Sequence, residues 1–326
     1  MNNNHEIIES LRNNAYVKEK DCGNNVHSFN FTRKAFYKKV WNAQTVRARG
    51  LFVNVNTDEI VARSYNKFFN LGEMEDADVT LAKLAYPVRC YVKENGYLAM
   101  CSWDRGNDCL FVASKSSTSG WFAGRARELI VATLSEEAID YLKNHNVTMI
   151  FEVIDPVNDP HIIRYEEAHA VLLDIVDNQF DCNFMDDDEV NAVSCAFNDH
   201  GTKYTHRKIL FTVCASENAL RDVLHQIDDT CTDLEGLVIV DNRGFRVKFK
   251  SAYYRFWKLV RGAVGNAQKV RERFDLADRD YYRRALAWLE SEAGMDAVSK
   301  CMISENRLNV VRLANVFEST ALGTRP

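Results

Sequence analysis

Lysine and glutamate residues recur at the borders of apolar, strand-like segments in the middle of the chain. Lys93 begins the tetrapeptide Lys-Glu-Asn-Gly between two such segments, Glu152 ends the next one, and Glu235 precedes another. Lys248 and Lys250 follow, on either side of a phenylalanine. Taken alone, the tetrapeptide is better explained as an Asn-Gly hairpin turn. The order of all these segments along the chain favours a common site instead.

Lysines two residues apart in a strand point to the same face, where their charges repel unless an anion lies between them. The carboxylates of Glu152 and Glu235 likewise need a partner, such as a metal ion or a ribose hydroxyl. One nucleophilic lysine, two further lysines and two carboxylates suit attack on the α-phosphate of a nucleotide. Neighbouring cations and desolvation favour the neutral amine, and a carboxylate-held Mg²⁺ would orient pyrophosphate as the leaving group. No GxxxxGK[ST] loop occurs, which disfavours a P-loop kinase or ATPase.

The elements expected to position these residues form a mixed α+β fold. The predicted strands span residues 51–55, 60–63, 88–92, 97–103, 111–113, 147–154, 170–176, 209–214, 237–240 and 245–249. The predicted helices span residues 28–41, 121–144 and most of 253–317, with Ser135 capping the later part of the second. We therefore expect a mostly antiparallel α+β body to about residue 250, followed by a small all-helical module.

Three local expectations can be compared directly with the structure. Residues 51–63 read as a hairpin that turns at Thr57-Asp58. Residues 88–103 read as a second hairpin with Gly96 at its turn. The acidic segment 186–189 resembles a metal cluster only in composition and reads as a solvated loop.

Composition excludes several classes of protein. The 326 residues are 46% hydrophobic with only 14 Gly and 4 Pro, so the chain is not disordered, collagenous or of low complexity. No run approaches the ~18 uncharged apolar residues of a membrane span, and the first residues lack a signal-peptide pattern, so we expect a soluble cytoplasmic protein that binds no membrane. The nine cysteines form no CxxC pair and predict buried free thiols, and no histidine spacing indicates zinc.

The net charge of −5 is distributed unevenly. Residues 243–284 contain 13 Lys and Arg against 4 Asp and Glu. This stretch is either a face that binds a polyanion or a solvated basic helix. Aromatic residues in it could stack on RNA bases or form a helix interface; they are Tyr253, Tyr254, Phe256 and Trp257.

Taken in order, the segments resemble the motifs of the covalent nucleotidyltransferases, the superfamily of polynucleotide ligases and mRNA capping enzymes. Residues 93–96 resemble motif I, 151–152 motif III, 161–175 motif IIIa, 235–236 motif IV and 247–250 motif V. Upstream, Arg-Gly-Leu-Phe at 49–52 and Lys-Phe-Phe-Asn-Leu-Gly-Glu at 67–73 are similar to the N-terminal signature of phage RNA ligase 1-type enzymes, the tRNA-repair ligases. The resemblance covers about residues 45–255.

This resemblance implies ATP-dependent joining of RNA 3′-OH and 5′-phosphate ends through a lysyl–AMP intermediate on Lys93. ATP and Mg²⁺, with Mn²⁺ as an alternative, are the implied cofactors. Lys248 and Lys250 would contact the α-phosphate, while Glu152 and Glu235 would support the metal ion or the ribose. It also implies an adenylyltransferase domain over residues 1–252, with a helical lead-in, and a helical module over 253–326.

Other positions take implied roles around the nucleotide. Arg49 and Lys67 would hold the departing pyrophosphate, and Lys115 matches a lysine that the family places after motif I. Phe69 and Gly96 would shape the pocket. An apolar residue of motif IIIa, Leu173, would pack on the adenine.

The resemblance also implies partners outside the nucleotide site. The basic stretch would hold an RNA backbone, with Arg255, Lys258 and Arg261 as the candidate contacts. The implied substrate is RNA with 5′-phosphate and 3′-OH ends, such as nicked tRNA. An end-healing kinase or phosphatase would prepare those ends, in the host cytoplasm if the enzyme is phage-encoded.

Two features depart from the family pattern. Asn95 stands where the family most often has Asp, although Asn also occurs there among RNA ligases. Only a short segment follows motif V, where the phage ligase has a longer specificity domain, so recognition of a tRNA anticodon loop is not implied.

Two alternative functions stay open at this point. A capping-type RNA guanylyltransferase is disfavoured by the upstream signature and by the lack of a β-rich segment after motif V, which also disfavours a DNA ligase. A non-catalytic RNA-binding relative is disfavoured because Lys93, Glu235, Lys248 and Lys250 are all present.

Overall fold

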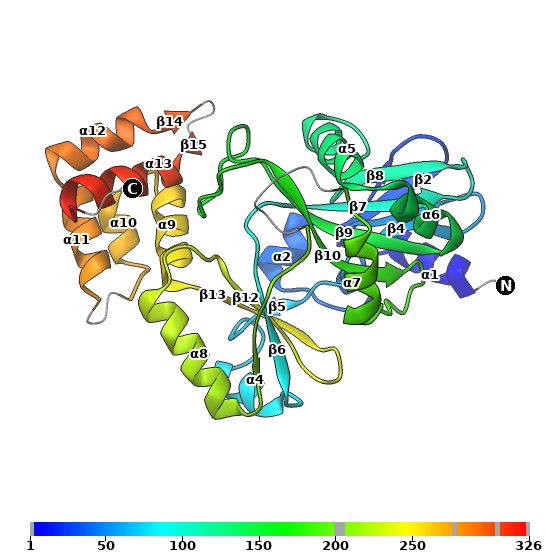
Figure 1. Cartoon of the computed structure of the whole chain (residues 1–326), viewed down its shortest axis with the longest axis horizontal. Coiled ribbons are helices and arrows are strands. Elements are labelled where there is room, and N and C mark those ends of the chain that lie inside the picture. Colours follow the sequence, from blue (N-terminus) through cyan, green and yellow to red (C-terminus); the bar gives the residue numbers. More distant parts are fainter. Residues whose placement is uncertain (1–2, 199–205, 276–278, 304–306, 324–326) are drawn as a thin grey trace. The chain divides into compact units, whose positions relative to one another are not determined.

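The computed structural model describes residues 3–198, 206–275, 279–303 and 307–323 (Figure 1). Contacts divide the chain into two compact units. Unit 1 comprises Met1–Phe68, Gly96–Ile154 and Glu167–Ile209, and unit 2 comprises Phe69–Asn95, Asp155–Glu166 and Leu210–Pro326. The chain therefore crosses between units inside the Lys-Glu-Asn-Gly tetrapeptide. These units differ from the two segments expected on either side of residue 252. The assignment of residues 1–252 as an adenylyltransferase domain and of 253–326 as a helical module stays a prediction.

Unit 1 contains two antiparallel four-stranded sheets. The first has the order β1 (Val17–Asp21), β2 (Val26–Phe31), β3 (Leu51–Asn54) and β4 (Glu59–Arg63). The second has the order β10 (His169–Asp177), β9 (Val147–Ile154), β7 (Tyr97–Asp104) and β8 (Cys109–Ser114).

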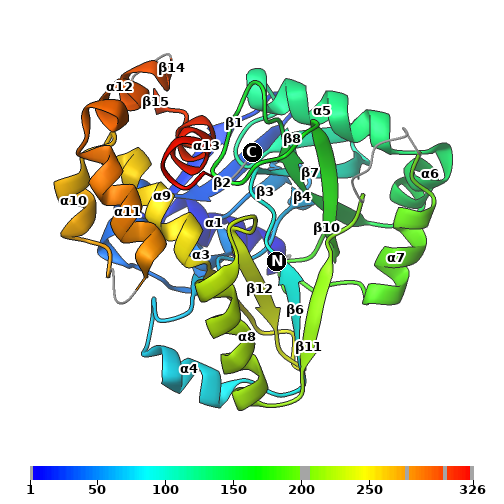
Figure 2. The ribbon, with the colours of Figure 1, turned by 60° about the vertical axis from the view of Figure 1, so that its left-hand side comes forward.

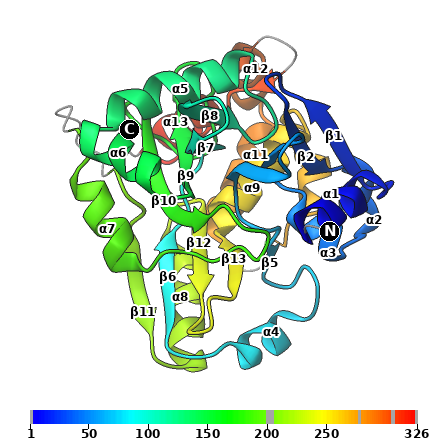
Figure 3. The same ribbon diagram turned by 90° about the vertical axis from the view of Figure 1, so that its right-hand side faces the viewer.

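Helices complete unit 1. They are α1 (Asn3–Arg12), α2 (Arg33–Lys38), α3 (Ala43–Arg47), α5 (Trp121–Thr133), α6 (Glu136–Asn144) and α7 (Asp187–Cys195). Apolar residues of α5, including Ala126 and Ile130, pack with Met149 and Phe151 of β9, so α5 covers one face of the second sheet (Figure 3). The predicted strand that carries motif III is thus buried except at Glu152, which is half-buried.

Unit 2 is built on a five-stranded sheet with the order β11 (Leu210–Cys214), β6 (Val88–Val92), β12 (Gly236–Val240), β13 (Arg246–Lys250) and β5 (Phe69–Asn70). Only the β13–β5 pair is parallel. Helices α4 (Ala77–Lys83) and α8 (Glu217–Thr230) bury apolar residues against this sheet, and Figure 2 shows α8 running along it.

The C-terminal helices belong to unit 2. They are α9 (Ala252–Gly262), α10 (Ala267–Arg271), α11 (Asp280–Leu289), α12 (Glu292–Lys300) and α13 (Val310–Ala321), with a short hairpin of β14 (Met302–Ile303) and β15 (Arg307–Leu308). Phe256, Trp257 and Phe317 are fully buried in their shared core. Ser251 caps α9 by accepting from Tyr254 N, so the helix starts directly after β13.

The expected α+β class, with mainly antiparallel sheets and C-terminal helices, is confirmed. The C-terminal segment is not all helical as expected, because it also contains the β14–β15 hairpin. The hairpin over 51–63 is present as β3 and β4, although an irregular register interrupts it. Helix 121–144 is two helices, because the chain leaves helical geometry at Leu134 and Ser135 caps the second by accepting from Ala138 N, as predicted.

Three expectations are wrong. Residues 88–92 and 97–103 form no hairpin, since β6 pairs with β11 and β12 while β7 pairs with β8 and β9. Residues 28–41 hold the end of β2 and the short α2 rather than one helix. The acidic segment is not a loop: Asp186 caps α7, and the next three carboxylates occupy its first turn, where the helix dipole favours negative charge.

Two findings concern the expectations drawn from composition, one on the cysteines and one on membrane spans. All nine cysteines are free thiols, as predicted, but only Cys90, Cys101, Cys214 and Cys301 are buried. Among the described residues, no helix is long and apolar enough to cross a membrane.

Candidate active site

Three segments of the unit 2 sheet bring the motif lysines and a glutamate together. Lys93 follows β6, and its backbone N–H donates to the carbonyl oxygen of Gly236 at 3.0 Å, which ties it to the start of β12. Glu235 directly precedes β12, and Gly236 pairs with Lys250 on β13. Adjacent strands thus deliver side chains that are far apart in sequence.

Glu235 is the centre of this group. Its carboxylate is 3% exposed, with Oε2 3.0 Å from Lys93 Nζ and Oε1 2.8 Å from Lys250 Nζ. Burial alone raises the pKa of Glu235, but the charges and hydrogen bonds of the two lysines outweigh it and hold that pKa below its usual range. In this state Glu235 is a carboxylate shared by two ammonium groups.

Asn95 fixes the loop that carries Lys93. Its side chain is buried, and Nδ2 donates to Glu235 Oε2 at 2.8 Å while Oδ1 accepts from the backbone N–H groups of Ile162 (3.0 Å) and Ile163 (3.1 Å). The two N–H donors define which end of the amide is oxygen. An amide can donate to Glu235, whereas the Asp usual in the family cannot do so when ionised. This contact gives the sequence departure a structural role.

Two glycines are required by close approach of the backbone. A Cβ on Gly96 would lie 2.0 Å from the carbonyl oxygen of Val153, and the N–H of Gly96 donates to Glu152 Oε1 at 3.0 Å. A Cβ on Gly236 would lie 2.0 Å from the carbonyl oxygen of Phe249. The glycines of motifs I and IV are therefore fixed by packing of strands within their own units.

Lys248 and Phe69 lie on the neighbouring edge of the unit 2 sheet. Lys248 is two residues from Lys250 on β13, as expected for side chains that share a face. Phe69, on β5, is paired with Val247, and Lys248 is paired with Asn70. Five predicted site residues thus lie on the strands of one sheet or directly beside them: Lys93, Glu235, Lys248, Lys250 and Phe69.

In unit 1 the structure brings together three other predicted cations. Lys67 is buried, with Nζ 4.9 Å from the centre of the Trp41 ring, and Lys115 Nζ lies 4.7 Å from the centre of the Phe31 ring. Lys115 as a residue is exposed, yet its amino group is crowded by protein atoms. Desolvation, then the positive charges of Arg49 and Lys67, lower the pKa of Lys115 to about 8. Because the positive charges of these three residues repel one another, a bound anion would stabilise them.

The surroundings of Arg49 support this arrangement. Burial lowers the pKa of the Arg49 guanidinium, and the nearby charge of Glu152 partly opposes that effect. Its Nη1 reaches only Ser64 Oγ and the carbonyl oxygen of Tyr65, both at 3.4 Å. Among the described residues, no carboxylate lies within ion-pair distance of Arg49. The positive charge of Arg49 is therefore kept near Lys67 and Lys115 by the packing of the side chain.

Leu173 occupies an irregular position of β10. The pairing of β10 with β9 shifts between Leu172 and Asp174, so Leu173 is the extra residue of a bulge. Its side chain is partly buried against the core formed by Tyr65, Leu98, Ile150 and Val176. A packing role in unit 1 is therefore shown, and the contact with adenine stays a prediction.

The residues of α9 that were predicted to contact RNA are of two kinds, buried aromatic residues and more exposed basic residues. The four aromatic residues of the basic stretch are buried in the helical core, so the helix-interface interpretation is confirmed and base stacking by these rings is wrong. Arg255 is held by Asp228, with Nη2 2.7 Å from Oδ2. Lys258 is exposed and Arg261 half-exposed, so both remain candidates for RNA contact.

The carboxylates fit a metal ion that arrives with the nucleotide. No group of three His, Cys, Asp or Glu side chains suited to a metal occurs within the described parts of the chain. Mg²⁺ keeps several waters and binds to proteins through one or two carboxylates plus substrate phosphates. Glu235 or Glu152 could supply one such oxygen.

Sequence reasoning missed Asn95 and Tyr165 as parts of the site. The Tyr165 hydroxyl accepts from Asn95 N at 2.9 Å and donates to Glu94 Oε2 at 2.7 Å. A polar residue inside motif I that differs from the usual Asp was a visible signal for Asn95. No signal pointed to Tyr165, since its contact depends on the fold of residues 155–166.

Comparisons with known proteins agree with this geometry. A sequence model described as RNA ligase, of the T4 RNA ligase 1 type, matches residues 47–254, well over half of the chain. No curated protein sequence matches significantly.

Solved structures share the fold at low sequence identity. A putative ATP-dependent DNA ligase from Aquifex aeolicus is 14% identical with a TM-score of 0.59, covering 91% of this chain and 79% of that one. An archaeal ATP-dependent RNA ligase is 12% identical with a TM-score of 0.59, covering 92% and 80%. These likenesses show a ligase fold, and the match over residues 47–254 shows that the chain belongs to the RNA ligase family.

Proposed function

We propose that the protein is an ATP-dependent RNA ligase that joins RNA 3′-OH and 5′-phosphate ends through a lysyl–AMP intermediate on Lys93. The observation that supports this most is the Glu235 carboxylate shared by Lys93 and Lys250 at 3.0 and 2.8 Å. It holds the proposed nucleophile and a second cation at one point, so both lysines are positioned where one bound phosphate could meet them.

In the first step the Lys93 amine attacks the α-phosphorus of ATP, the bond to the β-phosphate oxygen breaks, pyrophosphate leaves, and the amine loses a proton. The ion pair with Glu235 favours the ammonium form of Lys93, so it belongs to the resting enzyme. An α-phosphate bound by Lys248 and Lys250 would compete with Glu235 for Lys250. Rearrangement of this shared pair would then let Lys93 pass its ammonium proton to Glu235 or to water, so that the neutral amine can attack.

The unit 1 cations support the departure of pyrophosphate. Arg49, Lys67 and Lys115 form a cluster whose charges oppose one another, and an anion would relieve that repulsion. We assign them to the β- and γ-phosphates of ATP. Mg²⁺ bound with the nucleotide would neutralise part of the same charge.

Two further in-line displacements complete the reaction. An oxygen of the RNA 5′-phosphate attacks the phosphorus of lysyl–AMP, and the P–N bond breaks as Lys93 regains a proton. The RNA 3′-OH then attacks the 5′-phosphate, losing its proton, and AMP leaves. Positioning and charge neutralisation supply most of the acceleration in such transfers.

Finer assignments are part of the same proposal. A nicked tRNA is a suitable substrate because sealing needs the two ends that this chemistry joins. An end-healing kinase or phosphatase would supply those ends from damaged RNA. We place this activity in the cytoplasm, where RNA, ATP and reduced cysteine thiols coexist.

Labelling of the protein tests the proposal. The protein, first stripped of bound AMP with pyrophosphate, is incubated with Mg²⁺ and α-labelled ATP, with α-labelled GTP in parallel. We expect covalent label from ATP on Lys93. In Lys93→Ala the label is lost, but sealing of RNA with a pre-adenylylated 5′ end continues at a reduced rate. The matched control is Lys300→Ala, because Lys300 is an exposed lysine that pairs with Asp296, four residues before it on α12.

Each other outcome assigns a different function. Full activity of Lys93→Ala from ATP would mean that another residue is the nucleophile. Label from GTP alone would indicate a capping-type guanylyltransferase. The absence of label from either nucleotide would indicate an RNA-binding relative without catalysis.

A further inference from the structure

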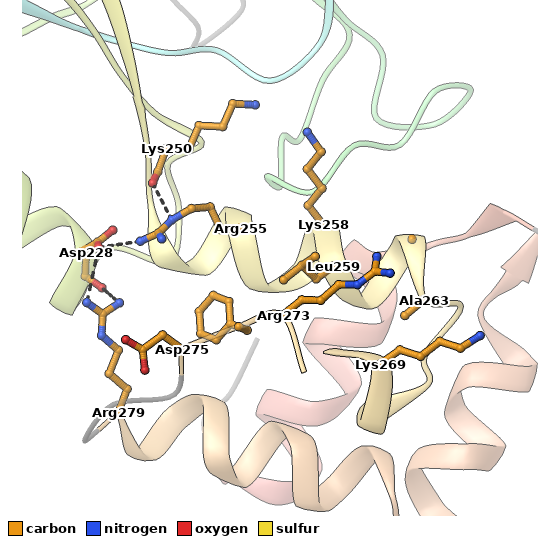
Figure 4. A pocket seen from close by; sticks show the side chains of 12 residues that line it. Asp228, Lys250, Arg255, Lys258, Leu259, Ala263, Lys269, Arg273, Asp275 and Arg279 are labelled. Carbon is orange, nitrogen blue, oxygen red and sulfur yellow. Dashed lines mark hydrogen bonds and ion pairs between the residues drawn. The ribbon is translucent and has the colours of Figure 1, made fainter. Parts of the chain in front are cut away.

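A basic pocket lies in unit 2 between the end of the sheet and the C-terminal helices. Its volume is about 740 Å³, and it is lined from α8, the end of β13, α9, α10 and the segments next to α11 (Figure 4). The charged lining residues are six cations and two carboxylates: Lys250, Arg255, Lys258, Lys269, Arg273, Arg279, Asp228 and Asp275. A concave surface with this excess of positive charge is suited to an anion of more than one charge.

The cations of the pocket fall into two classes. Arg255 and Arg279 both contact Asp228 Oδ2, at 2.7 and 3.4 Å, so that carboxylate holds them in the wall (Figure 4). Lys258, Lys269 and Arg273 have no carboxylate within ion-pair distance among the described residues. The first class builds the pocket, and the second leaves positive charge for a ligand.

Lys258 shows the electrostatic cost of this arrangement. Desolvation, followed by the positive charge of Lys250 and further by those of Arg261 and Lys93, lowers the pKa of Lys258, and the charge of Glu235 partly opposes these effects. The Nζ atoms of Lys250 and Lys258 lie 4.5 and 5.7 Å from the centre of the Tyr254 ring. The positive field of the pocket therefore continues into the group around Glu235.

Lys250 connects the pocket to the proposed chemistry. The residue lines the pocket, its carbonyl oxygen accepts from Arg255 Nε at 3.1 Å, and its amino group binds Glu235. A phosphate chain that occupies the pocket would therefore extend toward Lys93, the lysine proposed to accept and donate AMP, because Glu235 binds both Lys250 and Lys93. The phosphates of ATP are already assigned to Lys248 and Lys250 and to the unit 1 cations, which leaves Lys269 and Arg273 without a role in the first step.

We propose that this pocket binds backbone phosphates of the RNA strand next to its 5′-phosphorylated end, with Lys258, Lys269 and Arg273 as the contacts. This inference rests on the proposed function, because the 5′ end is the group that takes AMP from Lys93. Phosphodiesters carry one negative charge each and the terminal phosphate nearly two near neutral pH, so this end of the strand has the highest charge. The apolar wall of Leu259 and Phe274 suits sugar and base edges.

The test compares two double variants that remove the same charge. Lys269→Gln with Arg273→Gln removes two ligand-facing cations. Arg271→Gln with Lys300→Gln removes two exposed cations that lie outside the pocket lining and pair with Glu290 and Asp296. Binding of a 5′-phosphorylated single-stranded oligoribonucleotide is measured between 0.1 and 1 M salt. Lysyl–AMP formation and RNA adenylylation are measured as separate steps.

We expect the pocket variant to lose RNA adenylylation and salt-dependent binding, while lysyl–AMP formation, which needs no RNA, keeps the wild-type rate. Loss of two phosphate contacts lowers the slope of log affinity against log salt by about 1.4. Between 1 M and 0.1 M salt the wild type should then gain about 25-fold more affinity than the pocket variant. The control variant should keep the wild-type slope.

Several results would overturn the inference. These are an unchanged salt slope in the pocket variant, an equal loss in the control variant, or a raised requirement for ATP in lysyl–AMP formation, which would assign the pocket to ATP phosphates. If the wild type itself forms no lysyl–AMP, the proposed function fails. The salt slope would still decide whether the pocket binds RNA.

Discussion

The Asn95→Asp substitution is the most direct test of how the motif I loop is held. It keeps the size and shape of the side chain and leaves Oδ1 facing the N–H groups of Ile162 and Ile163. It replaces the Nδ2 donor, 2.8 Å from Glu235 Oε2, with a carboxylate oxygen. Two acceptors with negative charge would then face each other inside the protein.

The size of the effect follows from this distance. At an effective dielectric constant of 20, two unit charges 2.8 Å apart repel by about 6 kcal/mol. Uptake of one proton limits the loss, because protonating a carboxyl group at pH 7 costs only about 4 kcal/mol. Lys93 and Lys250 beside Glu235 offset a further part. We therefore expect the variant to be about 2–4 kcal/mol less stable at pH 7, which for a chain of 326 residues is a fall in unfolding temperature of roughly 3–6 °C.

The pH dependence identifies the cause. One carboxyl group of the new pair has a raised pKa in the folded state, so the variant recovers stability as that group binds a proton, and it loses stability as the pH rises from about 4 to 7. Unfolding temperatures at pH 5.0 and 7.5, each relative to wild type at the same pH, measure this difference. Lysyl–AMP formation should fall in parallel at pH 7.5.

Asn266→Asp is the matched control for this measurement. Asn266 is exposed and caps α10 by accepting from Lys269 N, and Asp caps a helix as well as Asn does. It should unfold at the wild-type temperature at both pH values. The reasoning is refuted if Asn95→Asp is as stable as wild type at pH 7.5, or if its loss is the same at both pH values.

Two further predictions concern the charges of each unit. In Glu235→Gln, Lys93 and Lys250 lose their shared carboxylate, so thermal unfolding at pH 7 should show a loss of about 3–5 kcal/mol. The pKa of Glu235 is lowered in the folded state from its ordinary value of 4.5. The extra stability of the wild type is therefore complete above pH 4.5 and is lost as the pH falls through the lower pKa of the folded state. A stability difference between wild type and variant that persists at acid pH would contradict this. In wild type, pyrophosphate affinity by titration calorimetry should weaken as the pH rises through about 8, where Lys115 loses its proton. Lys115→Met should lack that component, and an identical pH profile in the variant would exclude Lys115 from anion binding.

The strands of the site could be predicted from sequence, but not their partners. The segments that form β6, β7, β9, β12 and β13 were each predicted as strands. Of these, β9 and β12 are almost continuously apolar because both of their faces are largely buried. A short polar segment between two runs then favoured a hairpin at Gly96. The structure instead sends β6 and β7 into different sheets, since pairing is decided by strands that lie far away in sequence.

The charged residues of the candidate site could be predicted from the sequence, but their distribution between the two compact units could not. The order of the motifs identified Lys93, Glu235 and Lys250, which share one sheet of unit 2. It gave no indication that Lys67 and Lys115 lie in a different compact unit. A motif records the spacing along the chain, and the chain crosses between the units within three of these segments, namely 67–73, 93–96 and 161–175.

Residues 155–166 explain why the helical module groups with the sheet that carries Lys93. Ile162 and Ile163 donate their backbone N–H groups to Asn95 Oδ1, while their side chains are buried in the core of the C-terminal helices. Arg307, between α12 and α13, donates to Asp159 Oδ1 at 2.8 Å and to the carbonyl oxygen of Pro160 at 3.0 Å. The segment is thus fixed from both sides, by the helices and by the motif I loop. Because Asn95 also donates to Glu235, the helical core supports the residue that positions the shared carboxylate.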